Sequence, residues 1–362
     1  GQTNFAPNVC PMDFELLTSV LEELGEPPYR AKQVWEWTAR GAKSYDEMSN
    51  LPELLRLELD ERVPFSTLEL IDSAESRDGT VKALFHTHDK RPVEAVMMKY
   101  LDGRRSICVS SQSGCPLTCN FCATGTMAFG RNLTTAEILD QALFFKRIED
   151  DVNHLVFMGM GEPMMNLENV LAACEKLPDI GITSRRTTVS TVGWLPGIKQ
   201  FNKIDRPVRL ALSLHAADPE LRSKIMPVND RWPLEDVLAA CRRHFEENNR
   251  RVYIEYVMLD GINDQTIHAK QLAAVLQPHN AYKVNLIPYN PTGTGYGGSA
   301  RTTISAFQDA LKSEGVVATV RLTRGQDIAG QYRSSRRQQA SQQRQRRAQL
   351  LRQEAGDRPE QG

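Results

Sequence analysis

From residue 105 onward the chain alternates between short apolar runs of strand length and longer runs with helix spacing, and this alternation constrains the fold most. Candidate strands occupy residues 106–111, 154–158, 187–190, 209–214, 251–258, 283–287 and 317–322. Helix spacing occupies residues 134–148, 167–177, 234–245, 266–276 and 303–313. Alternation of this kind predicts a parallel sheet with helices on its outer face. About six such units predict an α/β fold, a partial (β/α)6 barrel, whose site residues lie at the C-terminal ends of the strands.

Three cysteines follow the first of these strands in the spacing C-x₃-C-x₂-C: Cys115, Cys119 and Cys122. Three thiolates are one short of a closed four-cysteine site. A [4Fe–4S] cluster held by three protein sulfurs leaves one iron open, and that iron can bind and reduce S-adenosylmethionine (SAM). A zinc site completed by a distant residue and cysteines without a ligand are the two alternatives, and the spacing favours the cluster.

The composition is that of a soluble globular protein. Of the 362 residues, 41% are hydrophobic and 25% are charged, and no apolar run reaches the roughly 20 residues that span a bilayer. The first ten residues lack the layout of a secretory signal, so we expect a cytoplasmic protein without a membrane anchor. Seven cysteines, three of them in one loop, favour reduced thiols over a disulfide framework. A net charge of −1 does not indicate nucleic-acid binding, although residues 331–362 carry eight arginines against three acidic residues.

The pattern divides the chain into four segments. Residues 1–66 have helix spacing and form a small N-terminal helical accessory domain, and residues 67–104 alternate as a short β unit with a hairpin turn at Asp78-Gly79. Residues 105–330 form the barrel. Residues 331–362 are an Arg/Gln-rich tail.

Polar or glycine-rich segments stand at the ends of several candidate strands. The second strand ends in a glycine-rich turn at residues 158–163, the third at Ser190, and the fourth at Ser213-Leu214-His215. The sixth runs into residues 285–291, which include Asn290. Parallel strands meet at one rim, so these groups are expected beside the cysteine loop, with the methionyl end of SAM at the glycine-rich turn.

Together these motifs resemble the RlmN/Cfr family of radical-SAM RNA methyltransferases. Particularly specific are residues 108–115, 158–163, 212–216 and 285–291. Residues 24–33 are similar to the family's N-terminal accessory domain. The resemblance covers roughly residues 12–328.

The resemblance implies a role for each matching position. Cys115, Cys119 and Cys122 would hold the cluster. Glu94 matches the family's general base, and Cys108 matches the cysteine that releases a covalent RNA–enzyme intermediate by forming a transient disulfide. The SAM contacts would be Gly161, Glu162, Ser190, Ser213, Leu214, His215 and Asn290.

The implied reaction is methylation of carbon 2 of an adenine, with carbon 8 the target in Cfr-type members. Its substrates are an adenine in 23S ribosomal RNA and, in several members, one in transfer RNA. Two SAM molecules are used. The first gives its methyl group to a second cysteine, the partner of Cys108 in the transient disulfide, and the second is cleaved to the radical. The implied partners are RNA and a one-electron reductant such as flavodoxin or ferredoxin, and the implied state is a monomer.

One position departs from the family. The methyl-carrying cysteine belongs to a segment R-G-x-D-I-x-A-A-C-G-Q-L, and here residues 324–333 read RGQDIAGQYR. Tyr332 stands at the cysteine's place, and no cysteine occurs after Cys241. An altered reaction, a diverged or reframed C-terminus, and substitution by Cys10 are three explanations. The alternative function is a degenerate radical-SAM homologue that cleaves SAM without completing methylation, and a third is a non-catalytic RNA-binding or zinc-stabilised module.

Overall fold

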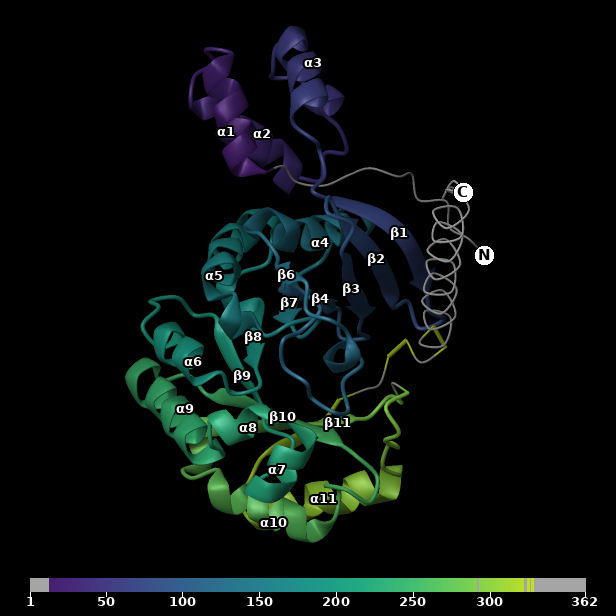
Figure 1. The fold of residues 1–362 in the computed structure, drawn as a ribbon, viewed down its shortest axis with the longest axis vertical. Coiled ribbons are helices and arrows are strands. Elements are labelled where there is room, and N and C mark those ends of the chain that lie inside the picture. Colours follow the sequence, from purple (N-terminus) through teal and green to yellow (C-terminus); the bar gives the residue numbers. More distant parts are fainter. Residues whose placement is uncertain (1–12, 292, 322–323, 326, 329–362) are drawn as a thin grey trace, which may run out of the picture.

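A ten-stranded sheet forms the centre of the molecule and determines where the candidate site residues lie (Figure 1). The computed structural model describes residues 13–291, 293–321, 324–325 and 327–328, so residues 331–362, with Tyr332, lie outside the described residues. The strands, in sheet order, are β1 (Leu68–Glu75), β2 (Val81–Thr87), β3 (Pro92–Lys99), β4 (Arg105–Cys108), β7 (His154–Phe157), β8 (Thr187–Thr191), β9 (Arg209–Ser213), β10 (Val252–Met258), β11 (Tyr282–Pro288) and β12 (Ala318–Val320).

The sheet has an antiparallel and a parallel part. Strands β1 to β4 pair antiparallel in chain order, and every pair from β4 to β12 is parallel. The predicted turn at Asp78-Gly79 is confirmed, because Ser76 N donates to Thr80 O at 2.8 Å and Gly79 has φ +79°. The predicted α/β fold with a mostly parallel barrel sheet is also confirmed. Predicted strand 106–111 is shorter than expected, since β4 ends at Cys108 and β5 (Gln112–Ser113) turns away to pair with β6 (Arg131–Asn132).

Helices cover the outer face of the parallel strands, as crossover connections require (Figure 1). The helices of this layer are α4 (Thr135–Ile148), α5 (Leu167–Lys176), α6 (Leu195–Phe201), α9 (Leu234–Asn248), α10 (Thr266–Val275) and α11 (Arg301–Ser313), whereas α7 (Pro219–Ile225) and α8 (Val228–Arg231) pack against the cysteine loop. Helix α4 begins with a capping box, in which Thr134 and Glu137 satisfy each other's backbone N–H groups. The short helices α6, α7 and α8 were not predicted, because runs of four to seven residues carry little periodic signal.

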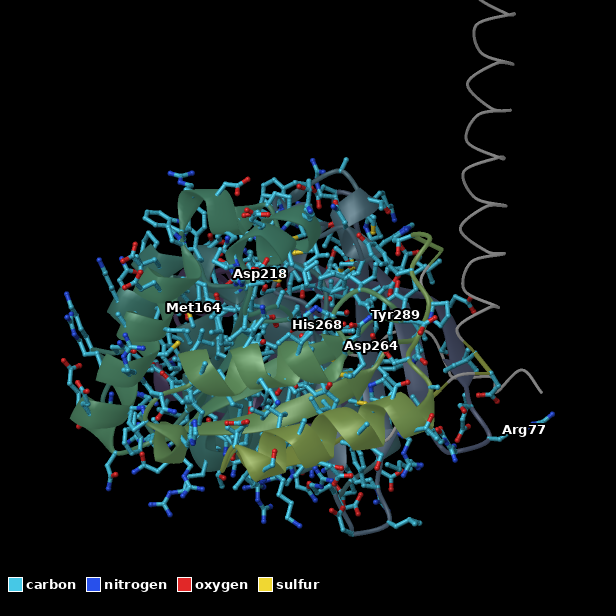
Figure 2. The ribbon with its side chains drawn as sticks, turned by 90° about the horizontal axis from the view of Figure 1, so that it is seen from below. Arg77, Met164, Asp218, Asp264, His268 and Tyr289 are labelled. Atoms are coloured by element: carbon cyan, nitrogen blue, oxygen red, sulfur yellow. The ribbon has the colours of Figure 1, made fainter. Side chains whose placement is uncertain are left out.

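The segment after β12 returns to the β1–β2 turn. Arg77 N donates to Asp327 Oδ2 at 3.2 Å, and the Ser76 hydroxyl donates to the same carboxylate. Gly325 N donates to Asp78 Oδ2 at 3.0 Å. Figure 2 shows Arg77 at the outer edge of the molecule. These bonds link the two ends of the sheet through loops rather than through strand pairing.

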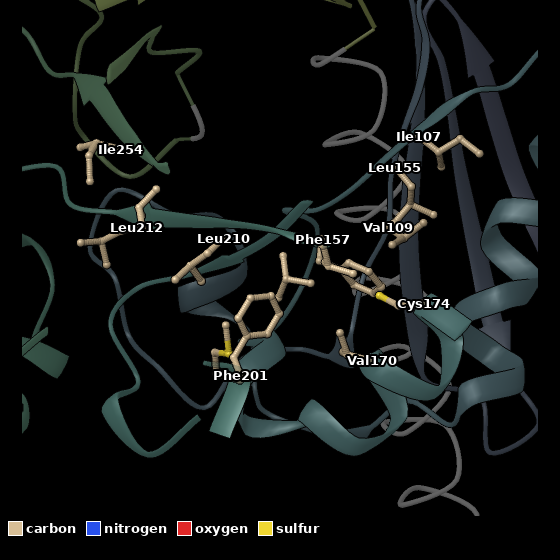
Figure 3. Close-up of a cluster of buried hydrophobic side chains, with 14 of the residues drawn as sticks. Ile107, Val109, Leu155, Phe157, Val170, Cys174, Phe201, Leu210, Leu212 and Ile254 are labelled. Atoms are coloured by element: carbon tan, nitrogen blue, oxygen red, sulfur yellow. The ribbon is translucent and has the colours of Figure 1, made fainter. Parts of the chain in front are cut away.

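The core lies between the sheet and its helices (Figure 3). Alternate residues of each strand point to the helices, so the residues between them face the interior of the barrel. Two cysteines outside the cysteine loop, Cys174 and Cys241, belong to this core and are 1% and 0% exposed. The residues labelled in Figure 3 come from four strands, the loop after β4 and two helices: Ile107, Val109, Leu155, Phe157, Val170, Cys174, Phe201, Leu210, Leu212 and Ile254.

The N-terminal helices have a core of their own. They are α1 (Phe14–Glu23), α2 (Tyr29–Ala39) and α3 (Glu53–Arg62), and their apolar faces meet in a separate cluster. Trp35 faces the barrel instead, and its Nε1 donates to Asp179 Oδ2 at 2.7 Å. Among the described residues, we find no helix with the length and apolar character needed to cross a membrane.

Candidate active site

A short antiparallel ribbon closes the base of the cysteine loop. Strand β5 precedes the cysteines, β6 follows them, and the two pair through Gln112 with Asn132 and Ser113 with Arg131. Gly130 N donates to Ser113 O at 2.8 Å, which continues the ribbon. The loop is therefore fixed at both ends.

Asn166, just before α5, forms a second connection between the two ends of the cysteine loop. Its Nδ2 donates to Ser111 O and to Leu133 O, both at 2.8 Å. The side chain is 3% exposed, so water does not compete for these bonds. One amide thus holds the residues before and after the loop together.

The three cysteines lie close enough to influence one another. Burial raises the pKa of the Cys119 thiol, and Cys122 and Cys115 raise it further. Burial likewise raises the pKa of Cys115 to about 11. The loop rests on α7, where Asn120 N donates to Ile225 O at 3.0 Å.

The three cysteine thiols form a donor set that fits an iron–sulfur cluster, in which each cysteine would bind a different iron. Three thiols project from one loop that is hydrogen-bonded at both ends, and burial raises the pKa of Cys115 and Cys119, so bound iron would have to stabilise these two thiolates. Within the described residues, no group of three or more His, Cys, Asp or Glu side chains is arranged to hold a single metal ion. Cluster sulfurs need not approach as closely as the ligands of one ion.

The glycine-rich turn after β7 lies directly against the base of the cysteine loop. Met160 O accepts from Ser111 N at 2.9 Å, and Glu162 N donates to Gln112 Oε1 at 2.8 Å. Gly161 has φ +97°, and a Cβ there would lie 2.5 Å from Gln112 Cβ. Only glycine allows this approach.

Glu162 is buried at the junction of β7 and β8. Its carboxylate accepts from Met164 N at 3.0 Å and from Val192 N at 2.9 Å. Burial raises the pKa of its carboxyl to about 7, although hydrogen bonds from Val192, Thr191 and Met164 oppose the rise. Glu162 therefore holds the ends of two strands together beside the cysteines.

The predicted serines lie side by side on neighbouring strands. Ser190 on β8 and Ser213 on β9 have their hydroxyl oxygens 3.3 Å apart. Leu214 is fully buried, and its N donates to Glu255 O at 3.0 Å. The structure thus brings the two hydroxyls together. The Leu214 side chain is buried in the core, so only its backbone could contact a ligand.

His215 packs against the cysteine loop. It has φ +60°, and its ring lies edge-on to Phe121 with 5.0 Å between centroids. Nδ1 accepts from Val257 N at 3.0 Å, and burial lowers the pKa of the imidazole to about 3. His215 is therefore neutral, with its proton on Nε2.

Tyr289, after β11 and labelled in Figure 2, also contacts the cysteine loop. Its hydroxyl donates to Phe121 O at 3.0 Å. The predicted SAM contact Asn290 is the next residue and is half-buried. The end of β11 thus also meets the cysteine loop.

Glu94 and Cys108 lie on the interior face of neighbouring strands. Cys108 pairs with Val96, two residues from Glu94, so both side chains project to the face away from the helices. Glu94 forms an ion pair with Lys82 at 3.5 Å. Burial raises the pKa of the Cys108 thiol to about 11, while Arg321 and Lys82 act to lower it.

Two charged residues that the sequence did not single out complete the surroundings. Arg222 on α7 is fully buried and donates to Val192 O at 2.7 Å, Leu214 O at 3.1 Å and Asn229 Oδ1 at 2.7 Å. Glu255 is buried on β10. An acid within a predicted apolar strand was a signal that could have found Glu255, whereas Arg222 has no such signal.

Comparison with known proteins agrees with this geometry. Residues 109–272 match the model of the radical SAM superfamily, and residues 7–64 match that of the ribosomal RNA large subunit methyltransferase N-terminal domain. The chain is 42% identical to a "Probable dual-specificity RNA methyltransferase RlmN" of Thermus thermophilus, over 86% of this chain and 90% of the relative. It is 45% identical to the protein of that name from Gemmatimonas aurantiaca, over 89% and 90%.

A crystal structure agrees as well. A radical SAM methyltransferase from Sphaerobacter thermophilus superimposes with a TM-score of 0.82 at 40% identity, covering 87% of this chain and 95% of that one. Fold, N-terminal unit and sequence identity over most of the length point to the same relatives. The chain belongs to the RlmN family of radical-SAM methyltransferases.

Proposed function

We propose that the protein methylates carbon 2 of an adenine in RNA, with 23S ribosomal RNA as the main substrate and transfer RNA as a second one. Family membership supports an iron–sulfur cluster and SAM as cofactors. A [4Fe–4S] cluster bound by Cys115, Cys119 and Cys122 would supply the electron that cleaves SAM into a carbon radical. The proposal rests on one observation: the cysteine loop, which is hydrogen-bonded at both ends, lies against the ends of β7, β8, β9 and β11.

The residues around that loop have distinct tasks. Gly161 lets the glycine-rich turn approach Gln112 at the base of the cysteine loop, and Ser190 and Ser213 offer adjacent hydroxyls. Glu94 would take the proton that leaves carbon 2, with Lys82 as its counter-charge. Cys108 would release the product as a thiolate; burial raises the pKa of its thiol and disfavours that form, and the positive charges of Arg321 and Lys82 oppose this rise only in part.

The experiment is anaerobic reconstitution with iron and sulfide, followed by SAM, a reductant and unmodified ribosomal RNA. Mass spectrometry should find 2-methyladenosine and deoxyadenosine. Cys119→Ala should abolish iron incorporation and both products, whereas Cys174→Ala, which removes a sulfur from the core, should retain them. Failure of the wild-type protein to bind iron or to cleave SAM would refute the proposal. Methylation at carbon 8 would show that the target atom is carbon 8 and not carbon 2.

A second candidate function is SAM cleavage without methylation. It is supported by Tyr332, which stands where the family has its methyl-carrying cysteine. A phenol cannot accept the methyl group and then release it by forming a disulfide with Cys108. Deoxyadenosine without methylated RNA is the outcome that this candidate requires.

A single substitution separates the two candidates further. Tyr332→Cys should create or raise methylation if that one side chain is what the chain lacks. Tyr332→Ser is the matched control, because it removes the phenol without supplying a thiol. Equal product from both variants would show that the new thiol plays no part.

A further inference from the structure

Glu255 lies at the middle of β10 and faces the interior of the barrel. Its neighbour Tyr256 points to the helices, with its ring 5.1 Å from that of Phe307. Val257, two residues on, packs in one cluster with Phe121 of the cysteine loop. Alternation therefore directs the Glu255 carboxylate into the space below that loop. The residue is 1% exposed.

Only half of this carboxylate is satisfied. Oε1 accepts from Asn285 Nδ2 and from Arg321 Nη2, each at 2.8 Å. Oε2 is buried and has no hydrogen-bond partner among the described residues. An ionised carboxylate is an acceptor only, so Oε2 requires a donor, and leaving such a group unpaired is unfavourable.

The position of Glu255 relates it to the proposed SAM contacts. In the parallel register Glu255 lies opposite Ser213, whose hydroxyl neighbours that of Ser190. The glycine-rich turn with Glu162, where we expect the methionyl end, follows β7. With its methionyl end at this turn, a SAM molecule extended across β8 and β9 would bring its nucleoside toward β10.

Arg321 and Asn285 also fix the direction of the free oxygen. Both donate to Oε1, so the carboxylate cannot turn without losing two hydrogen bonds. Thr319 donates to Asn285 Oδ1 at 2.8 Å and holds that amide in turn. Oε2 is therefore a preorganised acceptor.

We propose that Oε2 of Glu255 accepts a hydrogen bond from a ribose hydroxyl of SAM. The proposal deepens the proposed function and rests on it for the identity of the ligand. A ribose hydroxyl offers the donor that Oε2 lacks, and the ribose stands between the methionyl group and the adenine. Glu255 would be a binding residue and would take no part in the bond-breaking step.

Binding measurements test this without turnover. SAM and its 2′-deoxy and 3′-deoxy analogues are titrated into cluster-loaded protein by calorimetry, without reductant. Wild-type protein should bind one deoxy analogue about tenfold more weakly than SAM, as expected for a hydrogen bond to a charged group. Glu255→Ala, which leaves no side-chain donor or acceptor, should weaken SAM binding by a similar factor and should no longer distinguish SAM from that analogue. Thermal unfolding and iron content of the variant check that it folds.

The wild-type titration decides the matter even if the variant fails to fold. Equal affinity of wild-type protein for SAM and both analogues would overturn the proposal. So would a Glu255→Ala variant that still discriminates, because the hydroxyl would then have another partner. The substitution could abolish the discrimination while the wild-type protein makes no methylated RNA. That combination would uphold this inference and refute the proposed function alone.

Discussion

Replacing Asn166 by alanine should loosen the candidate cluster loop without touching any proposed ligand. The substitution removes three hydrogen bonds: the two buried bonds of 2.8 Å that Asn166 donates to the loop ends, and a part-buried bond of 2.9 Å that it accepts from Asn169 Nδ2. It leaves Leu133 O without its donor. Ser111 O keeps a second bond from Leu133 N at 3.1 Å, so one acceptor is orphaned rather than two. The two lost bonds to the loop ends at about 1 kcal/mol each, plus about 1 kcal/mol for the orphaned carbonyl, give a loss of about 3 kcal/mol. The bond with Asn169 adds to this loss, and it is also absent in the control below.

The assay is thermal unfolding of the cluster-free protein under reducing conditions. At about 2 °C per kcal/mol for a domain of this size, the melting temperature should fall by about 6 °C. Iron bound per chain after reconstitution should fall as well, because the two ends of the loop are no longer tied together. Limited proteolysis should then cut the chain between Ser113 and Gly130.

Asn169→Ala is the matched control. Its amide donates to Asn166 Oδ1 at 2.9 Å, but the residue is only half-buried and does not reach the loop. It should cost no more than about 1 kcal/mol and leave iron binding unchanged. A melting temperature of Asn166→Ala within 1 °C of this control would refute the reasoning.

Three further outcomes follow from other contacts. Gly161→Ala should destabilise the apoprotein, since its Cβ would lie 2.5 Å from Gln112 Cβ at φ +97°; urea unfolding measures this, and an unchanged midpoint would contradict it. Burial lowers the pKa of His244 to about 4, so the unfolded state binds the proton first and stability is lost as pH falls below about 6.5. This group alone should lower stability by about 1 kcal/mol from pH 7 to pH 5.5, so the fall measured by urea unfolding should be smaller by about that amount in His244→Gln than in the wild type. Trp35→Phe removes the 2.7 Å bond to Asp179 and should cost about 1–2 kcal/mol by thermal unfolding, with no effect on iron content.

The sequence predicted those parts of the site that depend on local spacing or on the ends of parallel strands. The cysteine spacing lies within one loop, and Ser190, Ser213 and His215 follow successive strands. Because such strands end at one rim, their order along the chain was enough to bring these residues together. The α/β fold was predictable for the same reason, since crossovers between parallel strands require helices.

What the sequence did not predict is how the loop is held. The amide of Gln112 reaches Asn132 and Glu162, and that of Asn166 reaches Ser111 and Leu133. These bonds join residues 20 to 55 positions apart. Asn and Gln in loops occur throughout proteins, and no periodicity distinguishes an amide that joins two segments from one that faces water.

Strand alternation links the stability of this barrel to its chemistry. On β10, Tyr256 packs against α11, while Glu255 and Val257 face the interior. A slip of one residue would turn Glu255 toward the helices and Tyr256 inward, at the cost of burying an unpaired carboxylate in an apolar layer. The apolar residues that pack on the helices therefore fix the register, and the register fixes which side chains can meet a ligand. One inserted residue within β10 should thus abolish SAM binding and destabilise the fold together, whereas one at Gly261, beyond the strand, should be far milder.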